Sequence, residues 1–173
     1  KKSLKYKKIN EVRLEIVCLA AYRPLHSFSW SKEIETFNEI KNLIIQQISN
    51  PKKELSIKKK LISHKIKDAV SLKVSDQYEA NPYPRWERIA LNRVPSNPVN
   101  FFNNLNLKFD YNKIQSWDKI NVLVAGCGTG QHAIATATKY KSSYITAIDL
   151  SLNSLSYAKR CADELGINNI EFI

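Results

Sequence analysis

Apolar residues recur at helical spacing through the first 80 residues of the chain. Val12, Ile16 and Leu19 fall on one face of residues 11–22, and Pro24 follows closely enough to end a helix there. Residues 31–48 predict a second helix that Ser31 caps and that Asn50-Pro51 ends. Its apolar stripe consists of Ile34, Phe37, Ile40, Ile44 and Ile48.

Two further helices are expected before residue 81. One covers residues 53–63, and the other covers residues 66–80, where Ile66, Val70 and Val74 recur every four residues. Four prolines then favour an extended path and indicate a boundary, with a short helix expected over residues 98–110. These prolines are Pro82, Pro84, Pro95 and Pro98.

The pattern changes at Asn121, where apolar strands begin to alternate with helices. Continuous apolar strands joined by helices predict parallel pairing with right-handed crossovers. Gly166 marks the end of the second of these helices. The predicted fold is α/β, a Rossmann-like doubly wound parallel sheet with about three strands present, preceded by a helical N-terminal region. We expect a helical region at residues 1–80, a proline-rich lid or linker at 81–120, and half of a sheet domain at 121–173.

Composition narrows the function classes. The net charge is +11, yet residues 1–75 hold 17 basic against 7 acidic residues, while the remainder holds 10 against 9. The Lys-rich segments lack interleaved aromatic residues for base stacking, which disfavours nucleic acid as a partner. The three cysteines are far apart, which predicts neither a disulfide framework nor a metal site.

No segment suits a membrane span or a signal peptide, so a cytoplasmic protein is expected. The chain contains no methionine and stops in an apparent third strand, which predicts a fragment of a longer protein.

A glycine-rich turn follows the first predicted sheet strand. Gly126, Gly128 and Gly130 stand where the strand meets its helix, and Asp149 closes the second strand. Glycines there leave room for a ligand beside the free N–H groups of a helix, and an acid at that place accepts hydrogen bonds from ribose hydroxyls. Dinucleotide sites usually carry G-x-G-x-x-G, whereas this turn reads G-C-G-T-G.

The segments "VLVAGCGTGQ" and "AIDLS" closely resemble the first two motifs of class I S-adenosylmethionine-dependent methyltransferases. The resemblance implies S-adenosylmethionine as the cofactor. The residues that it places at the cofactor are Gly126, Cys127, Gly128, Gly130, Gln131, Asp149 and Leu150. Cys127 is expected to be a small packing residue of the turn rather than a nucleophile. His132 is expected to face solvent or to have its hydrogen bonds satisfied, rather than to act as a base.

The block "QYEANPYPRW" at residues 77–86 resembles a bacterial group of methyltransferase-domain proteins that are often joined to tetratricopeptide repeats. Our hypothesis is that Tyr78 and Tyr83 line a lid over the cofactor and that Arg85 pairs with its methionyl carboxylate. The alternative is that Trp86 and the tyrosines only anchor the helical region to the sheet.

The methyl acceptor and the catalytic residues cannot be named, because the second half of such a domain would lie beyond Ile173. The fragment alone is therefore expected to be inactive. Three other classes remain open. An aminopropyltransferase-like enzyme would use the same fold, and a non-catalytic interaction protein would bind a protein partner through its helical N-terminal region. A nicotinamide reductase is disfavoured by the glycine spacing.

Overall fold

The structure is a computed structural model that describes residues 9–34, 38–62, 67–92, 94–103, 105, 108, 110 and 119–173. The chain divides into two compact units, Lys1–Ser56 and Ile57–Ile173. The division expected from the sequence, into a helical region at 1–80, a lid or linker at 81–120 and half of a sheet domain at 121–173, stays a prediction. In the described part of the chain, no helix has the length and apolar character needed to cross a membrane.

The first unit is built from short helical segments. They are α1 (Ile9–Tyr22), η2 (Leu25–Ser27), η3 (Ser29–Glu33), η4 (Asn38–Ile40), α2 (Lys41–Ile44), the π-helical turn η5 (Ile45–Ser49) and most of α3 (Asn50–Lys58). Val12 and Ile16 are buried as the periodicity predicts, together with Leu25, Ile44 and Ile48. Ile34 and Ile40 of the predicted stripe are partly buried against this cluster. Phe37, the remaining member of the stripe, lies outside the described residues.

The predicted second helix is wrong in two respects. Its beginning is the separate 3-10 segment η3, where the N-cap is Phe28 rather than Ser31. Asn50-Pro51 does not end it, because the backbone stays helical and α3 begins at Asn50. Pro51 lacks the N–H that would bond to the Gln47 carbonyl oxygen four residues earlier, and the His26 ring Nδ1 lies 3.2 Å from that oxygen instead. The π-helical turn lies directly before this point.

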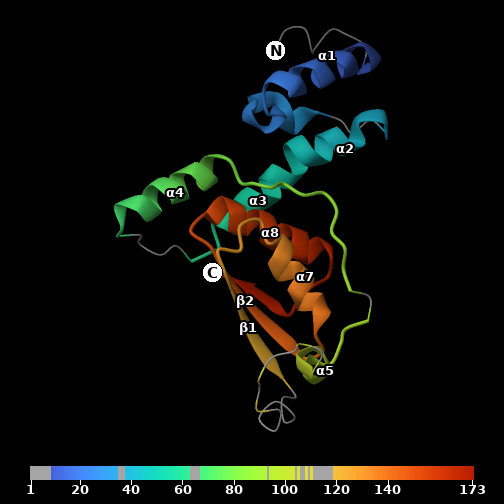
Figure 1. Ribbon diagram of the computed structural model, residues 1–173. Coiled ribbons are helices and arrows are strands. Elements are labelled where there is room, and N and C mark those ends of the chain that lie inside the picture. The colour runs from blue at the N-terminus through green and yellow to red at the C-terminus, as the bar shows by residue number, and fades with distance from the viewer. Residues whose placement is uncertain are drawn as a thin grey trace. The chain divides into compact units, whose positions relative to one another are not determined.

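The second unit contains the predicted sheet. The strands β1 (Ile120–Ala125), β2 (Ser143–Ile148) and β3 (Ile170–Phe172) pair in parallel in the order β1-β2-β3. The helices α7 (Gln131–Lys139) and α8 (Leu152–Glu164) connect them and lie on the same side of the sheet (Figure 1). Gly166 has φ +69° directly after α8, so the predicted stop is confirmed. The described strands therefore form the predicted Rossmann-like α/β arrangement.

The core of this unit lies between the sheet and its two helices. Ile134 of α7, Ile145 of β2 and Leu155 of α8 are fully buried there. Alternate residues of the strands face the other side, where Leu123 and Tyr144 are 63% and 44% exposed. The glycine turn therefore joins the end of β1 to α7, one of the two helices that cover this face of the sheet.

Two further helices precede the sheet, α4 (Ala69–Ala80) and α5 (Pro98–Asn103). Asp68 caps α4 by accepting the N–H of Ser71 at 2.7 Å. The predicted apolar face of α4 is wrong, because Val70 and Val74 are 70% and 41% exposed while Ser75 is buried. Ile66, the first residue of that predicted face, lies outside the described residues. The helix docks by polar contacts instead, which apolar periodicity does not reveal.

Candidate cofactor site

A cavity of about 890 Å³ opens where the carboxyl ends of β1 and β2 meet α4 and the segment after it. Ligand sites typically enclose about 300 to 1,000 Å³. The lining residues include Val74, Ser75, Tyr78, Tyr83, Pro84, Gly126, Cys127, Gly128, Thr129, Gln131, His132, Ile148, Asp149, Leu150, Ser151 and Ile173. The cavity thus brings together residues from around 74–84 and 126–151, which are distant in the sequence.

The three glycines of the turn all have positive φ but face different surroundings. A Cβ at Gly126 would meet nothing within 4 Å, and one at Gly128 would come no closer than 4.0 Å to the Tyr83 carbonyl oxygen. A Cβ at Gly130 would lie 2.5 Å from that of Ala158 in α8. Gly126 and Gly128 therefore keep space open for a ligand, whereas Gly130 allows α7 to begin against α8.

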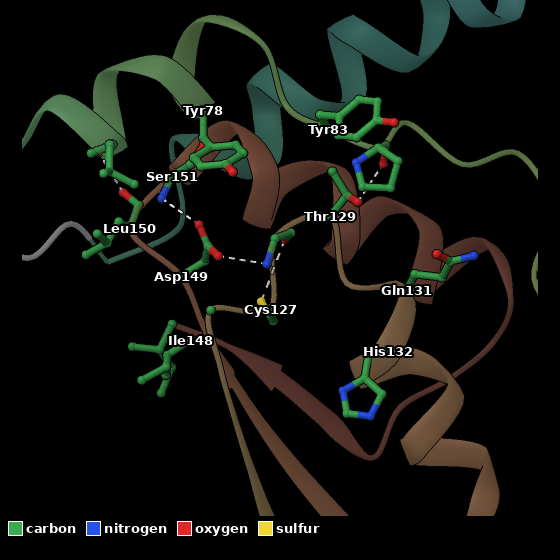
Figure 2. A pocket seen from close by; sticks show the side chains of 16 residues that line it. Tyr78, Tyr83, Cys127, Thr129, Gln131, His132, Ile148, Asp149, Leu150 and Ser151 are labelled. Carbon is green, nitrogen blue, oxygen red and sulfur yellow. Dashed lines mark hydrogen bonds between the residues drawn. The ribbon is translucent and has the colours of Figure 1, made fainter. Parts of the chain in front are cut away.

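Asp149 lies between the glycine turn and the loop that follows β2 (Figure 2). Its Oδ2 accepts the N–H of Gly128 at 2.7 Å, and its Oδ1 accepts the N–H of Ser151 at 2.9 Å. A carboxylate has about four acceptor positions on its two oxygens, so each oxygen keeps capacity for another donor. The carboxylate is consequently fixed in place and still able to accept hydroxyl groups from a ligand.

Cys127 is part of the turn rather than a reactive group. Its N–H donates to the carbonyl oxygen of Ile148 at 3.0 Å, and its carbonyl oxygen accepts the N–H of Gly130 at 2.9 Å. Burial, and to a lesser extent the neighbouring Asp149 carboxylate, raise the pKa of the thiol to about 12. The thiol therefore stays protonated at neutral pH, where a nucleophile would have to be a thiolate.

The block at residues 77–86 lies along the cavity. Tyr78 extends from α4 on the side of Asp149, whereas Tyr83 lies on the side of Thr129 (Figure 2). Tyr78 is 41% and Tyr83 is 75% exposed, so both rings have surface that a ligand can cover.

Trp86 anchors the end of this block. Its indole Nε1 donates to the carbonyl oxygen of Thr129 at 3.0 Å, and the Thr129 hydroxyl donates to the carbonyl oxygen of Pro84 at 2.6 Å. The Tyr157 hydroxyl donates to the Trp86 carbonyl oxygen, and the two rings meet edge to face. Tyr78 and Tyr83 thus line the cavity while Trp86 holds the segment to the glycine turn and α8, and the role of the two tyrosines as a lid over a cofactor stays a prediction.

Arg85 is directed to α8. Its guanidinium carbon lies 4.5 Å from the centre of the Tyr157 ring, and Arg85 is not among the residues that line the cavity. Gln131 and His132, at the start of α7, do line it. The role of Arg85 at a cofactor carboxylate stays a prediction.

Sequence reasoning missed four polar residues around the cavity. Ser75, Glu79, Thr129 and Ser151 make hydrogen bonds that join α4 and the following segment to the two strand ends. Glu79 and Thr129 stand inside the two motifs that were singled out, and Ser151 precedes α8 as its N-cap. Their positions were visible in the sequence, but their partners depend on the tertiary fold.

The class defined by this geometry is an α/β protein with a nucleotide-type cofactor site at the ends of parallel strands. Residues 122–173 match the family model described as a methyltransferase domain. This match supports a class I S-adenosylmethionine-dependent methyltransferase and indicates S-adenosylmethionine as the cofactor. A search of curated proteins gave no match.

Several solved structures are similar in part. They include the [4+2]-cyclase SpnF, with 34% identity, 32% of this chain and 20% of that chain covered, and a TM-score of 0.30. A SAM-dependent methyltransferase from Aquifex aeolicus is 16% identical, and the match covers 63% of this chain and 47% of that chain with a TM-score of 0.30. Coclaurine N-methyltransferase bound to N-methylheliamine and SAH is 17% identical, and the match covers 95% of this chain and 47% of that chain with a TM-score of 0.39. The chain therefore spans less than half the length of each of these three proteins.

Proposed function

We propose that the protein transfers a methyl group from S-adenosylmethionine to an acceptor, and that this chain carries its cofactor-binding half. The observation that supports this most directly is the pairing of Asp149 with the open turn at Gly126 and Gly128 inside a cavity of suitable volume. The methyltransferase-domain match at residues 122–173 covers both features. The cofactor would supply an activated methyl group on a sulfonium, whose transfer needs positioning and exclusion of water more than a general base.

The described residues fit such a ligand in two ways. The two glycines provide a surface without side chains at the end of β1, and the free acceptor capacity of Asp149 suits the two hydroxyls of a ribose. Leu150 is 45% exposed and lines the cavity, so it is our proposed contact for the adenine ring. Tyr78 and Tyr83 would cover the ligand from α4 and from the segment that follows it.

The narrower proposals concern the rest of the protein. We propose membership of the bacterial group with the Q-Y-E-x-N-P-Y-P-R-W block, a protein partner for the helical N-terminal region, and a cytoplasmic location. The acceptor is left open. Arg85 as the partner of the cofactor carboxylate is tested by Arg85→Ala, which should weaken binding by about 1.5 to 3 kcal/mol.

Calorimetric titration of S-adenosylmethionine and S-adenosylhomocysteine into the full-length protein tests the proposal. We expect micromolar binding by the wild type and its loss in Asp149→Ala, because each hydrogen bond to the carboxylate contributes about 1.5 to 3 kcal/mol. Glu171→Ala is the control, since this carboxylate lies on β3 and is not among the residues that line the cavity. A folded wild type that binds neither ligand would favour the interaction protein instead. Binding of the decarboxylated cofactor in preference would favour aminopropyl transfer.

A further inference from the structure

Glu79, the next-to-last residue of α4, contacts the loop that joins β2 to α8. Its Oε2 accepts the backbone N–H of Asn153 at 2.8 Å and the hydroxyl of Ser151 at 3.3 Å. The Asn153 side chain in turn donates its Nδ2 to the Glu79 carbonyl oxygen at 2.6 Å. Lys58 lies 3.3 Å from the other carboxylate oxygen. The end of α4 and the beginning of α8 are therefore joined by reciprocal hydrogen bonds.

The contact with Asn153 stabilises the start of α8. The first N–H groups of a helix have no partner within the helix, and a negative charge near them is favourable. Ser151 caps the same helix by accepting the N–H of Ser154 at 3.0 Å. Glu79 adds a carboxylate to the start of α8 from a different helix, so this second contribution is present only while α4 is docked.

The loop that Glu79 holds is the loop that orients Asp149. The N–H of Ser151 donates to Asp149 Oδ1, while the Ser151 hydroxyl donates to Glu79. A second contact holds the residue between them, because the Ser75 hydroxyl donates to the Leu150 carbonyl oxygen at 3.1 Å. Each residue from Asp149 to Ser151 is thus bonded, directly or through its neighbour, to α4.

We propose that Glu79 is a positioning residue for the cofactor site, which fixes Asp149 and Leu150 through Ser151 and Asn153. The inference rests on the proposed function, because it assigns Asp149 and Leu150 to the cofactor. Glu79 is not among the residues that line the cavity, so it acts through the loop rather than on the ligand. Tyr78, the residue before Glu79 in α4, lines the cavity, so the contact that holds the end of α4 against the loop also holds this ring at the site.

The test is calorimetric binding of S-adenosylmethionine to the full-length protein and to variants at this contact. Glu79→Ala should raise the dissociation constant about tenfold, which corresponds to about 1.4 kcal/mol. Glu79→Gln keeps an oxygen that can accept the Asn153 N–H, so it should restore most of the affinity. Lys58→Ala should bind nearly as the wild type does, because the ion pair is partly exposed, with side chains 32% and 27% accessible. Asp76→Ala removes an exposed carboxylate from the same helix and is the matched control.

Asn153→Ala gives a milder second variant in case Glu79→Ala does not fold. It removes only the donor to the Glu79 carbonyl oxygen and should weaken binding in the same direction. Hydrogen exchange of residues 149–154 without ligand should become faster in both variants.

The outcomes separate the two proposals. A wild type that binds no cofactor contradicts the proposed function, and the role of Glu79 with it. A wild type that binds, together with a Glu79→Ala variant that binds equally well but unfolds at a lower temperature, overturns the positioning role alone. Weaker binding with rescue by Gln supports it.

Discussion

At the scale of single residues, the three glycines of one short turn are needed for different physical reasons. Gly126 and Gly128 leave the cavity open, whereas Gly130 is required by the contact between α7 and α8. The sequence predicted that this turn would meet a ligand, and it placed all three glycines at the cofactor. The role of Gly130 in packing could not be predicted, because Ala158 comes from a helix 28 positions later whose approach only the fold defines.

We expect Gly130→Ala to destabilise the fold strongly. The added Cβ would lie 2.5 Å from the Ala158 Cβ in a residue with φ +79°, and overpacking alone costs about 1 to 3 kcal/mol. Urea unfolding at equilibrium measures the change. Gly166→Ala is the matched control, because Gly166 also has positive φ, +69°, but no atom within 4 Å of the added Cβ. Equal losses of stability in the two variants would show that backbone strain, not packing, is the cause.

At the scale of elements, the sheet was predictable and the docking of α4 was not. Strands β1 and β2 carry apolar runs bounded by a glycine turn and by Asp149, so their type, order and parallel pairing follow from local pattern. Helix α4 also has an apolar repeat, yet it buries Ser75 and leaves Val70 exposed. The reason is that its partner is a loop with free backbone groups, to which serine and glutamate side chains bond.

The Thr129 hydroxyl bonds to the segment after α4, through the carbonyl oxygen of Pro84. Removal of this hydroxyl should loosen the segment. Thr129→Val keeps the shape of the side chain but leaves the Pro84 carbonyl oxygen without this donor, which should cost about 1 kcal/mol. Limited proteolysis and hydrogen exchange of residues 81–86 measure the release.

Thr136→Val is the comparison variant, since the Thr136 hydroxyl donates within α7, to the His132 carbonyl oxygen. Exchange in residues 81–86 should stay unchanged in that variant. If both variants left this segment equally protected, the anchoring role of Thr129 would have to be abandoned.

At the scale of the whole molecule, the chain consists of two units with separate cores. The first unit has a small buried cluster around Ile16 and Leu25, whereas the second buries residues from three strands and two helices. A smaller core excludes less apolar surface from water and supplies less stability. The net charge of +11 is shared between them: the first unit has 11 basic and 6 acidic residues, and the second has 16 and 10.

Native-state hydrogen exchange should therefore resolve two stabilities. Amides of α1 should exchange faster than those of α8, because the first unit opens at a lower free energy. Ile16→Ala, which removes a side chain only 4% exposed, should cost about 2 to 5 kcal/mol within the first unit and accelerate exchange in α1. Exchange in α8 should be unaffected. Equal acceleration in both helices would mean that the two units unfold as one.

The division of roles among the three glycines also has an evolutionary consequence. A lineage that kept the fold but no longer bound a cofactor would be released from the demand for open space at Gly126 and Gly128, and only their positive φ values of +66° and +53° would still favour glycine there. It would still have to keep Gly130, because the contact with Ala158 does not depend on a ligand. Replacement of the first two by Asn or Asp, which tolerate positive φ, with retention of the third would mark a descendant in which the open space is no longer needed.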